Sequence, residues 1–231
     1  NKIMADTSGN IGFLLTGQLP IRRGGPAHFP VPGWTGEHEW VREVPFEQMP
    51  QEVNPPNHFV SNSNNLIVPH DYPHYVTAQR SFSRAQRVVQ MLSGRQPFTP
   101  EKFAQMHADR FHIPGHRLAQ RIAFLEPSTK PGQQARDILA AWDGYQERES
   151  TGAAVYEVLL WKLYEATLGR LRAWMSDPKP SNETLRSFLP AVLGLIQRDD
   201  RELLTHDAFP FNDWDAPLTQ ALDSAAEHLS Q

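Results

Sequence analysis

The 231-residue chain has 39% apolar and 21% charged residues, which is the composition of a folded globular protein rather than of a disordered segment. Its formal net charge is −4, and its basic residues are scattered, so we expect no nucleic-acid partner, because phosphate neutralisation needs a concentrated basic face. No apolar run is long enough to span a membrane, and no membrane partner is expected. The absence of cysteine excludes disulfides, zinc–thiolate sites and a cysteine nucleophile within this chain.

The first 78 residues combine short β-type runs with many Pro, Gly and Asn residues. Ile3-Met4-Ala5 and the run at 11–15 flank Asp6-Thr7-Ser8-Gly9-Asn10, which predicts a β-hairpin with Gly9 at positive φ. Prolines interrupt residues 20–56, so this segment is neither a regular helix nor a central strand. We expect its aromatic side chains to hold it against a core: Phe29, Trp34, Trp40 and Phe46.

From about residue 80 the apolar spacing becomes helical. It predicts a helix over 85–92 with Gly94 as C-cap, and Thr99-Pro100 reads as an N-cap followed by proline in the first turn. Further helices are predicted at 133–142, at 150–175, between Leu185 and Ile196 with a kink or break at Pro190, and at 218–229. The sequence therefore predicts an α+β protein, with a β/loop segment at 1–78 and a helical subdomain at 79–231.

Several common catalytic patterns are missing from the sequence. There is no G-x-S-x-G or S-x-x-K arrangement of a serine nucleophile and no glycine-rich phosphate loop between a strand and a helix. Five of the ten histidines lie in two groups. Helical zinc ligands are spaced four apart, whereas the second group is spaced five and then four, with Pro114 interrupting the second interval. We interpret these residues as surface or capping histidines rather than metal ligands: His70, His74, His107, His112 and His116.

Two carboxylate pairs, Asp199-Asp200 and Asp213 with Asp215, raise the alternative of a carbohydrate-active hydrolase, given six tryptophans that could stack on sugars. A glycosidase needs two carboxyl groups that converge across a fixed gap, whereas neighbours on a helix point to different faces. The pattern favours helix caps and solvated faces for the carboxylates, and a core location for the tryptophans.

Three asparagines follow an apolar run within the segment 58–66: Asn62, Asn64 and Asn65. Buried amides are costly unless each finds a hydrogen-bond partner. Such a cluster is typical of a turn, but asparagine amides also serve as oxyanion donors in acyl transfer. The cluster alone leaves both interpretations open.

The order of short motifs around this cluster resembles the large subunit of the penicillin amidase family, from residue 5 to about 168. Each motif is short, and the weight lies in their order along the chain. They are Ala5-Asp6, Gly9-Asn10-Ile11-Gly12, Gly17, Pro20-Ile21-Arg22, Pro30-Val31-Pro32-Gly33-Trp34, Glu39-Trp40, Pro45, Pro50, Asn54-Pro55, Asn62-x-Asn64-Asn65, Asp71-Tyr72-Pro73, Arg84-x-x-Arg87-Val88 and Trp142-Asp143-Gly144 followed by Ser150.

The resemblance implies an N-terminal nucleophile hydrolase with an αββα sandwich, made as a precursor that cuts itself to expose a serine. In that family the serine attacks an amide, its own α-amino group acts as base, and an asparagine amide with a backbone N–H holds the oxyanion. By motif position the asparagine is Asn64, and Arg84 is the arginine that organises the active site. Asn62 and Asn65 are then expected to orient the loop.

The chain departs from the family pattern at three places. Arg42 and the segment Pro56-Asn57-His58 stand where glycines are usual, and we expect Asn57 to supply the left-handed backbone conformation there. Val76 and Thr77 stand where an acidic residue is expected after Asp71-Tyr72-Pro73, so a structural calcium ion of the parent protein would not find a complete site here. No cofactor is expected for catalysis.

The resemblance thus predicts hydrolysis of linear amides by a longer parent protein whose nucleophilic serine is not in this chain. The chain alone is expected to be an inactive internal piece, whose partners are the remaining parts of the same precursor and a small-molecule amide. A periplasmic or secreted location follows from the resemblance. The alternative from another class is a non-catalytic helical binding or scaffold module.

Overall fold

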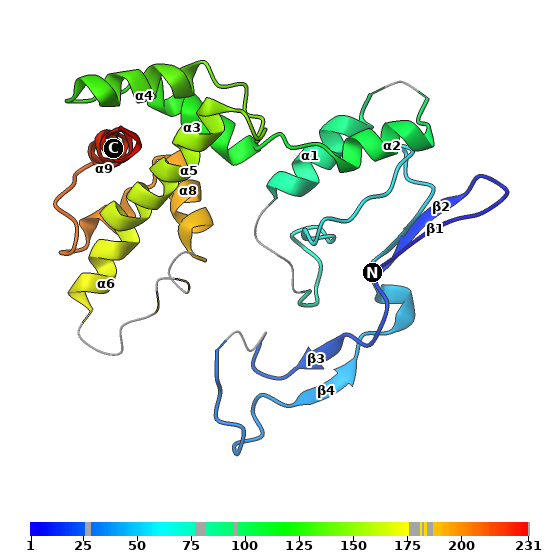
Figure 1. The fold of residues 1–231 in the computed structure, drawn as a ribbon. Coiled ribbons are helices and arrows are strands. Elements are labelled where there is room, and N and C mark those ends of the chain that lie inside the picture. The colour runs from blue at the N-terminus through cyan, green and yellow to red at the C-terminus, as the bar shows by residue number, and fades with distance from the viewer. Residues whose placement is uncertain are drawn as a thin grey trace. The chain divides into compact units, whose positions relative to one another are not determined.

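Strands come first along the chain and α-helices begin at Ser83, in a computed structural model that describes residues 1–25, 29–76, 82–94, 97–175, 181, 183 and 187–230 (Figure 1). The residues form two compact units, Asn1–His107 and Ala108–Gln231. The predicted boundary near residue 78 lies outside the described residues and stays a prediction. The protein is of mixed α and β structure, rich in helix and with few strands, whereas an αββα sandwich stays a prediction.

Two small antiparallel sheets form the strand part of the first unit. One has the order β1-β2-β5 and the other pairs β3 with β4. The strands are β1 (Lys2–Ala5), β2 (Ile11–Leu14), β3 (Pro20–Arg22), β4 (Trp40–Glu43) and β5 (Gln51–Val53), with a 3₁₀ turn at Phe46–Gln48. The predicted hairpin is confirmed, with Lys2 opposite Leu14 and Gly9 at φ 84°.

A chain of polar side chains ties the hairpin turn to β5. The Asp6 carboxylate accepts hydrogen bonds from the backbone N–H groups of Ser8 and Asn10 and from Asn10 Nδ2. Asn10 Oδ1 in turn accepts one from Asn54 Nδ2 at 2.8 Å, and Asn54 Oδ1 accepts one from the N–H of Ile11. These hydrogen bonds lower the pKa of Asp6, those from Asn10 first. The turn and the end of β5 therefore hold each other in register.

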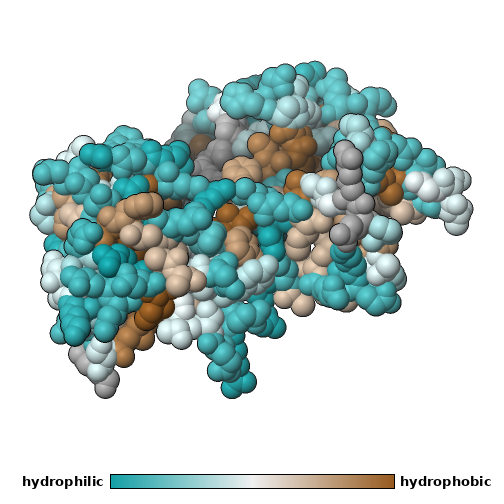
Figure 2. All heavy atoms as spheres, turned by 90° about the horizontal axis from the view of Figure 1, so that it is seen from above, coloured by the Kyte–Doolittle hydropathy of each residue, from teal (hydrophilic) through white to brown (hydrophobic). Residues whose placement is uncertain are grey.

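The aromatic residues of the proline-rich segment are not buried, which corrects our expectation. Their exposed fractions are 82% for Phe29, 88% for Trp34, 68% for Trp40 and 62% for Phe46. Hydrophobic residues are visible among hydrophilic ones on the molecular surface (Figure 2). The segment has little core to pack on, because few of the described side chains of the first unit are buried, among them Val44 and Met49.

Two helices close the first unit, α1 (Ser83–Leu92) and α2 (Pro100–His107). Ser93 rather than Gly94 caps the end of α1, because the helix ends without a left-handed residue. Thr99 caps α2 as predicted, since its hydroxyl accepts a hydrogen bond from the N–H of Lys102.

The second unit is helical. Its elements are α3 (Ile113–Ile122), α4 (Lys130–Ala140), α5 (Thr151–Tyr164), a π-helical turn (Glu165–Gly169), α6 (Arg170–Trp174), α8 (Leu189–Arg198), a 3₁₀ turn (Glu202–Thr205) and α9 (Asp215–Leu229). The helix predicted at 150–175 is present but contains the π turn. Pro190 lies in the first turn of α8 rather than in a kink, where its missing N–H costs nothing, and Leu185 lies outside the described residues. Helix α3 was not predicted from the sequence.

The core of this unit forms where α9 packs against α4 and α5 (Figure 1). Trp214, Tyr156 and Leu222 are fully buried there, and Trp142 is nearly so. Only two of the six tryptophans are buried, so the core interpretation holds for Trp142 and Trp214 and is wrong for the exposed Trp34, Trp40, Trp161 and Trp174. Within the described residues, none of the helices has the length and apolarity to cross a bilayer.

Candidate active site

The asparagine segment folds into a tight turn held by its own side chains. Asn62 Oδ1 accepts a hydrogen bond from the backbone N–H of Asn64 at 3.2 Å, and Asn65 Oδ1 accepts one from the N–H of Ser63 at 3.1 Å. Asn64 has φ 62°, a left-handed conformation that asparagine tolerates better than most residues. The sequence left two interpretations of the asparagines open, a turn or a set of oxyanion donors. Both are compatible with the structure, because this turn exposes the Asn64 side chain.

Arg84, in the first turn of α1, contacts this turn directly. Its Nη2 atom donates to Asn64 Oδ1 and to the carbonyl of Ser63, each at 2.9 Å. The structure therefore brings together the two residues that the sequence singled out, which are 20 positions apart.

The contact determines which way the Asn64 amide points. A guanidinium has only N–H donors, so the atom of Asn64 that faces Arg84 must be the oxygen. The nitrogen, Asn64 Nδ2, consequently points away from Arg84, and within the described part of the chain it has no hydrogen-bond partner. The result is an exposed, oriented amide donor.

The backbone before this turn differs from our expectation. His58 has φ 61° and Asn54 has φ 51°, whereas Asn57 is not in the left-handed region. The left-handed position of Pro56-Asn57-His58 is therefore taken by His58. The N–H of His58 donates to the carbonyl of Pro55, which closes the short turn that requires this conformation.

The Asp71-Tyr72-Pro73 motif anchors the chain after the asparagine turn. The Tyr72 hydroxyl donates to the carbonyl of Gln48 at 2.9 Å, and a ring nitrogen of His74 lies 3.1 Å from Gln48 Oε1. No cluster of three His, Cys, Asp or Glu side chains among the described residues is arranged to hold a metal ion. Val76 stands at the position of the expected acidic residue, and the absence of a complete calcium site stays a prediction.

In the second unit, the Trp142-Asp143-Gly144 motif and Ser150 have structural roles. Trp142 Nε1 donates to the carbonyl of Tyr145, and Asp143 accepts from the N–H of Tyr145. Gly144 has φ 86°, and Ser150 caps α5 by accepting from the N–H of Ala153. The motif therefore shapes the entry into α5.

His112 is a capping histidine, as predicted. Its Nδ1 accepts a hydrogen bond from the N–H of Gly115 at 3.0 Å, and its ring lies against Tyr156. Burial lowers the pKa of His112, which Glu157 partly opposes. This cap is the signal that the sequence analysis missed for α3, because Pro114 suits a first helical turn.

The carboxylate pairs are engaged in caps and ion pairs. Asp199 and Asp215 both contact Arg121, at 3.3 and 3.0 Å, and Asp199 also pairs with Arg201, whose hydrogen bond lowers the Asp199 pKa. Asp200 accepts from the N–H of Glu202, and Asp213 accepts from the N–H of Ala216. The interpretation as caps and solvated faces is thus confirmed, because Asp200 and Asp213 bind backbone N–H groups and Asp199 and Asp215 form exposed ion pairs.

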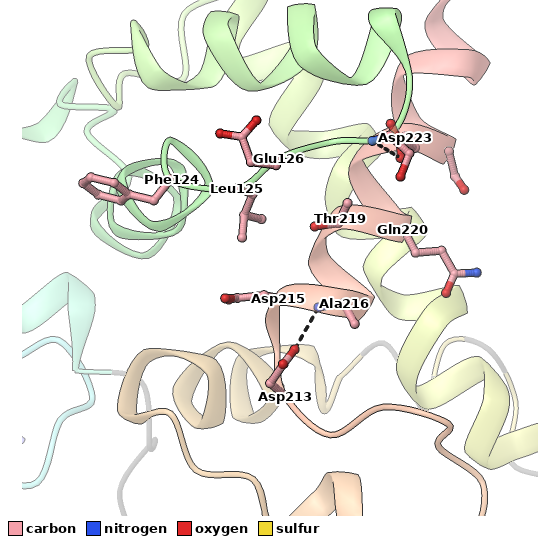
Figure 3. A pocket seen from close by; sticks show the side chains of 11 residues that line it. Phe124, Leu125, Glu126, Asp213, Asp215, Ala216, Thr219, Gln220 and Asp223 are labelled. Carbon is pink, nitrogen blue, oxygen red and sulfur yellow. Dashed lines mark hydrogen bonds between the residues drawn. The ribbon is translucent and has the colours of Figure 1, made fainter.

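Asp213 and Asp215 also line an open hollow of about 710 Å³ at the start of α9 (Figure 3). Across it, Asp223 on α9 accepts from the N–H and hydroxyl of Thr129 and from the N–H of Ser128, so it holds the N-cap residue of α4 in place. Each of these carboxylates already has a structural partner, and the hollow marks a helix junction rather than a converging catalytic pair.

Comparisons with known proteins agree with the resemblance in the sequence. The family model described as penicillin amidase matches residues 1–231, so the chain belongs to the penicillin amidase family. It is 29% identical, over its whole length, to a penicillin acylase 2 proenzyme of Pseudomonas sp. (strain SE83). It is 29% identical over 69% of its length to the acyl-homoserine lactone acylase QuiP of Pseudomonas syringae pv. syringae (strain B728a).

The fold is also that of a solved acylase. The thermostable penicillin G acylase from Alcaligenes faecalis matches 99% of the chain with a TM-score of 0.71 at 21% sequence identity. The chain spans 30% and 21% of the lengths of the two curated relatives and 46% of the solved chain. The family comprises acylases, but the activity of the whole protein is a matter for proposal.

Proposed function

We propose that this chain is part of an enzyme that hydrolyses linear amides, removing N-acyl groups, and that it supplies the oxyanion donor Asn64. The observation that carries the proposal is the bond from Arg84 to Asn64 Oδ1 in a member of the penicillin amidase family. The names of both curated relatives describe acylases, one of penicillin and one of acyl-homoserine lactones.

In the proposed reaction, an N-terminal serine outside this chain attacks the amide carbonyl, and its own α-amino group accepts the hydroxyl proton. An α-amino group suits this task because its pKa, about 8, lies near working pH. The carbonyl oxygen becomes an oxyanion, to which Asn64 Nδ2 donates a hydrogen bond. The amine then leaves with the proton, and water releases the acyl group by the same steps. No cofactor is needed.

Arg84 serves this step by keeping the Asn64 amide in one orientation. A freely rotating amide would present its oxygen to the oxyanion for part of the time, which would repel the developing charge. A donor fixed in advance costs no reorganisation during the reaction, and this is the main source of oxyanion-hole stabilisation.

We propose further that the remaining parts of the same precursor are the partners of this chain, and that they cover its exposed aromatic residues, among them Phe29, Trp34 and Trp40. The isolated chain would then lack the nucleophilic serine and be inactive. By family resemblance we place the mature enzyme in the periplasm or outside the cell. Any structural calcium ion of the parent would draw its ligands from elsewhere.

The experiment is to purify the product of the full-length gene, determine its subunit masses and N-termini, and assay amide hydrolysis by it and by this chain. A serine-starting subunit that hydrolyses N-acyl amides, with this chain inert, supports the proposal. An active isolated chain, or a parent without an N-terminal serine, would show that the mechanism is wrong. An inert parent that still binds a protein partner would favour the scaffold alternative.

A further inference from the structure

Asn62 holds the backbone of the proposed oxyanion donor. Its Oδ1 lies 3.2 Å from the backbone nitrogen of Asn64, two residues later, in an Asx-type turn. Because a backbone N–H only donates, it fixes the Asn62 amide just as Arg84 fixes that of Asn64. The Asn62 oxygen faces the turn, and its nitrogen faces the other way.

The orientation of the Asn62 amide leaves its nitrogen without a hydrogen-bond partner in the described part of the chain. Asn62 Nδ2 is shielded from solvent and has no hydrogen-bond partner among the described residues. A shielded donor without an acceptor opposes folding, and an aspartate or serine could close the same kind of turn without one. The chain nevertheless has a neutral amide here, next to the site where negative charge would develop.

The bond also acts on a residue in a demanding conformation. Asn64 has φ 62°, which is unfavourable for most residues with a side chain though less so for asparagine, and such conformations persist where the surroundings enforce them. Two bonds act on Asn64, one on its backbone N–H and one on its side-chain oxygen. Removing either would let its Nδ2 move.

We propose that Asn62 is a positioning residue for Asn64, acting through its Oδ1 on the backbone N–H of Asn64. This inference rests on the proposed function of Asn64 as the oxyanion donor. Aspartate at this position would also accept the bond, but its charge would oppose the oxyanion. A neutral acceptor is therefore the requirement at residue 62.

The test uses four variants of the full-length enzyme. N62A and N62Q remove the two-residue turn bond, N62Q because its longer side chain no longer fits it. N62S keeps a neutral acceptor, and N65A is the matched control, since Asn65 bonds to the N–H of Ser63 instead. Turnover is measured per active site, counted with an acylating titrant, so that incomplete maturation does not enter kcat.

We expect N62A and N62Q to lower kcat by about 10-fold or more with KM little changed, because oxyanion contacts act mainly in the transition state. N62S should recover most of this loss, and N65A should cost clearly less. If N62A does not mature, the comparison of kcat between N62Q and N62S tests the positioning role instead. Equal losses of kcat in N62Q and N62S, or in N62A and N65A, would show that Asn62 only supports the loop and does not position Asn64.

The N64A variant separates this inference from the proposed function. If N64A loses activity and N62A and N62Q do not, the positioning role is wrong and Asn64 keeps its role. If N64A keeps its activity, the oxyanion assignment itself fails.

Discussion

The Nη2 atom of Arg84 lies 2.9 Å from Oδ1 of Asn64, and this bond joins the first turn of α1 to a turn that carries an exposed amide donor. We expect R84A in the full-length enzyme to lower kcat by about 10- to 100-fold, because a misplaced group costs rate steeply. The thermal unfolding midpoint should change little, since the contact is exposed. R84K, which can donate to Asn64 but lacks the planar fork, should have a kcat between those of the wild type and R84A. Wild-type kinetics in R84A would remove Arg84 from the site.

Replacing Asn64 itself should have a larger effect. N64A should lose about 10²–10³ in kcat, the usual cost of removing one oxyanion donor. N64D is the sharper variant, because it keeps an oxygen that faces Arg84 but replaces the Nδ2 donor with a charged carboxylate oxygen, which would repel the oxyanion. If N64D matched the wild-type rate in steady-state kinetics, the donor role would be wrong.

The Asp223 side chain should stabilise the second unit by holding Thr129, the N-cap residue of α4. It accepts two backbone N–H groups and the Thr129 hydroxyl at 2.6 Å. D223A should lower the free energy of unfolding by about 1–3 kcal/mol, because it leaves the three donors around the N-cap of α4 without their acceptor. E227A, an exposed carboxylate on the same helix, is the control and should change it little. Denaturant titration followed by circular dichroism measures both.

Two helical glycines should respond to alanine in opposite directions. A Cβ on Gly152 would lie 2.5 Å from Trp142 Cγ, so G152A should destabilise the protein by about 1–3 kcal/mol through overpacking. A Cβ on Gly194 would meet only the flexible end of Arg198 at 3.3 Å. G194A should therefore stabilise α8 by about 0.5–1 kcal/mol. Equal effects in thermal unfolding would contradict the close packing at Gly152.

His112 should make stability depend on pH. Burial lowers its pKa in the folded state, so the unfolded chain binds a proton first as the pH falls. Stability from this group is complete above about pH 6.5, the ordinary histidine value, and declines as the pH falls below it toward the lowered pKa of the folded state. Urea titrations at pH 7.5 and pH 5.5 should show a larger loss for the wild type than for H112N, which keeps a capping oxygen without titrating. The same loss in both proteins would exclude His112 as the cause.

The sequence by itself determined the local elements and the family. The hairpin around Gly9, the cap at Thr99 and most helices of the second half, α3 excepted, follow from residue spacing and turn chemistry, which act over a few residues. The motif Asn62-x-Asn64-Asn65 and the position of Arg84 also predict a site from the sequence alone.

Only the tertiary structure decided which of these residues meet. The contact of Arg84 with Asn64 spans 20 positions, and that of Asp223 with Thr129 spans 94, distances over which periodicity carries no information. The burial of aromatic residues was decided in the same way. Trp142 and Trp214 lie where helices converge, whereas Trp34 and Trp40 lie on a segment with little core beneath it. Burial depends on what packs against a side chain, and that is a property of the assembled fold rather than of its neighbours in the sequence.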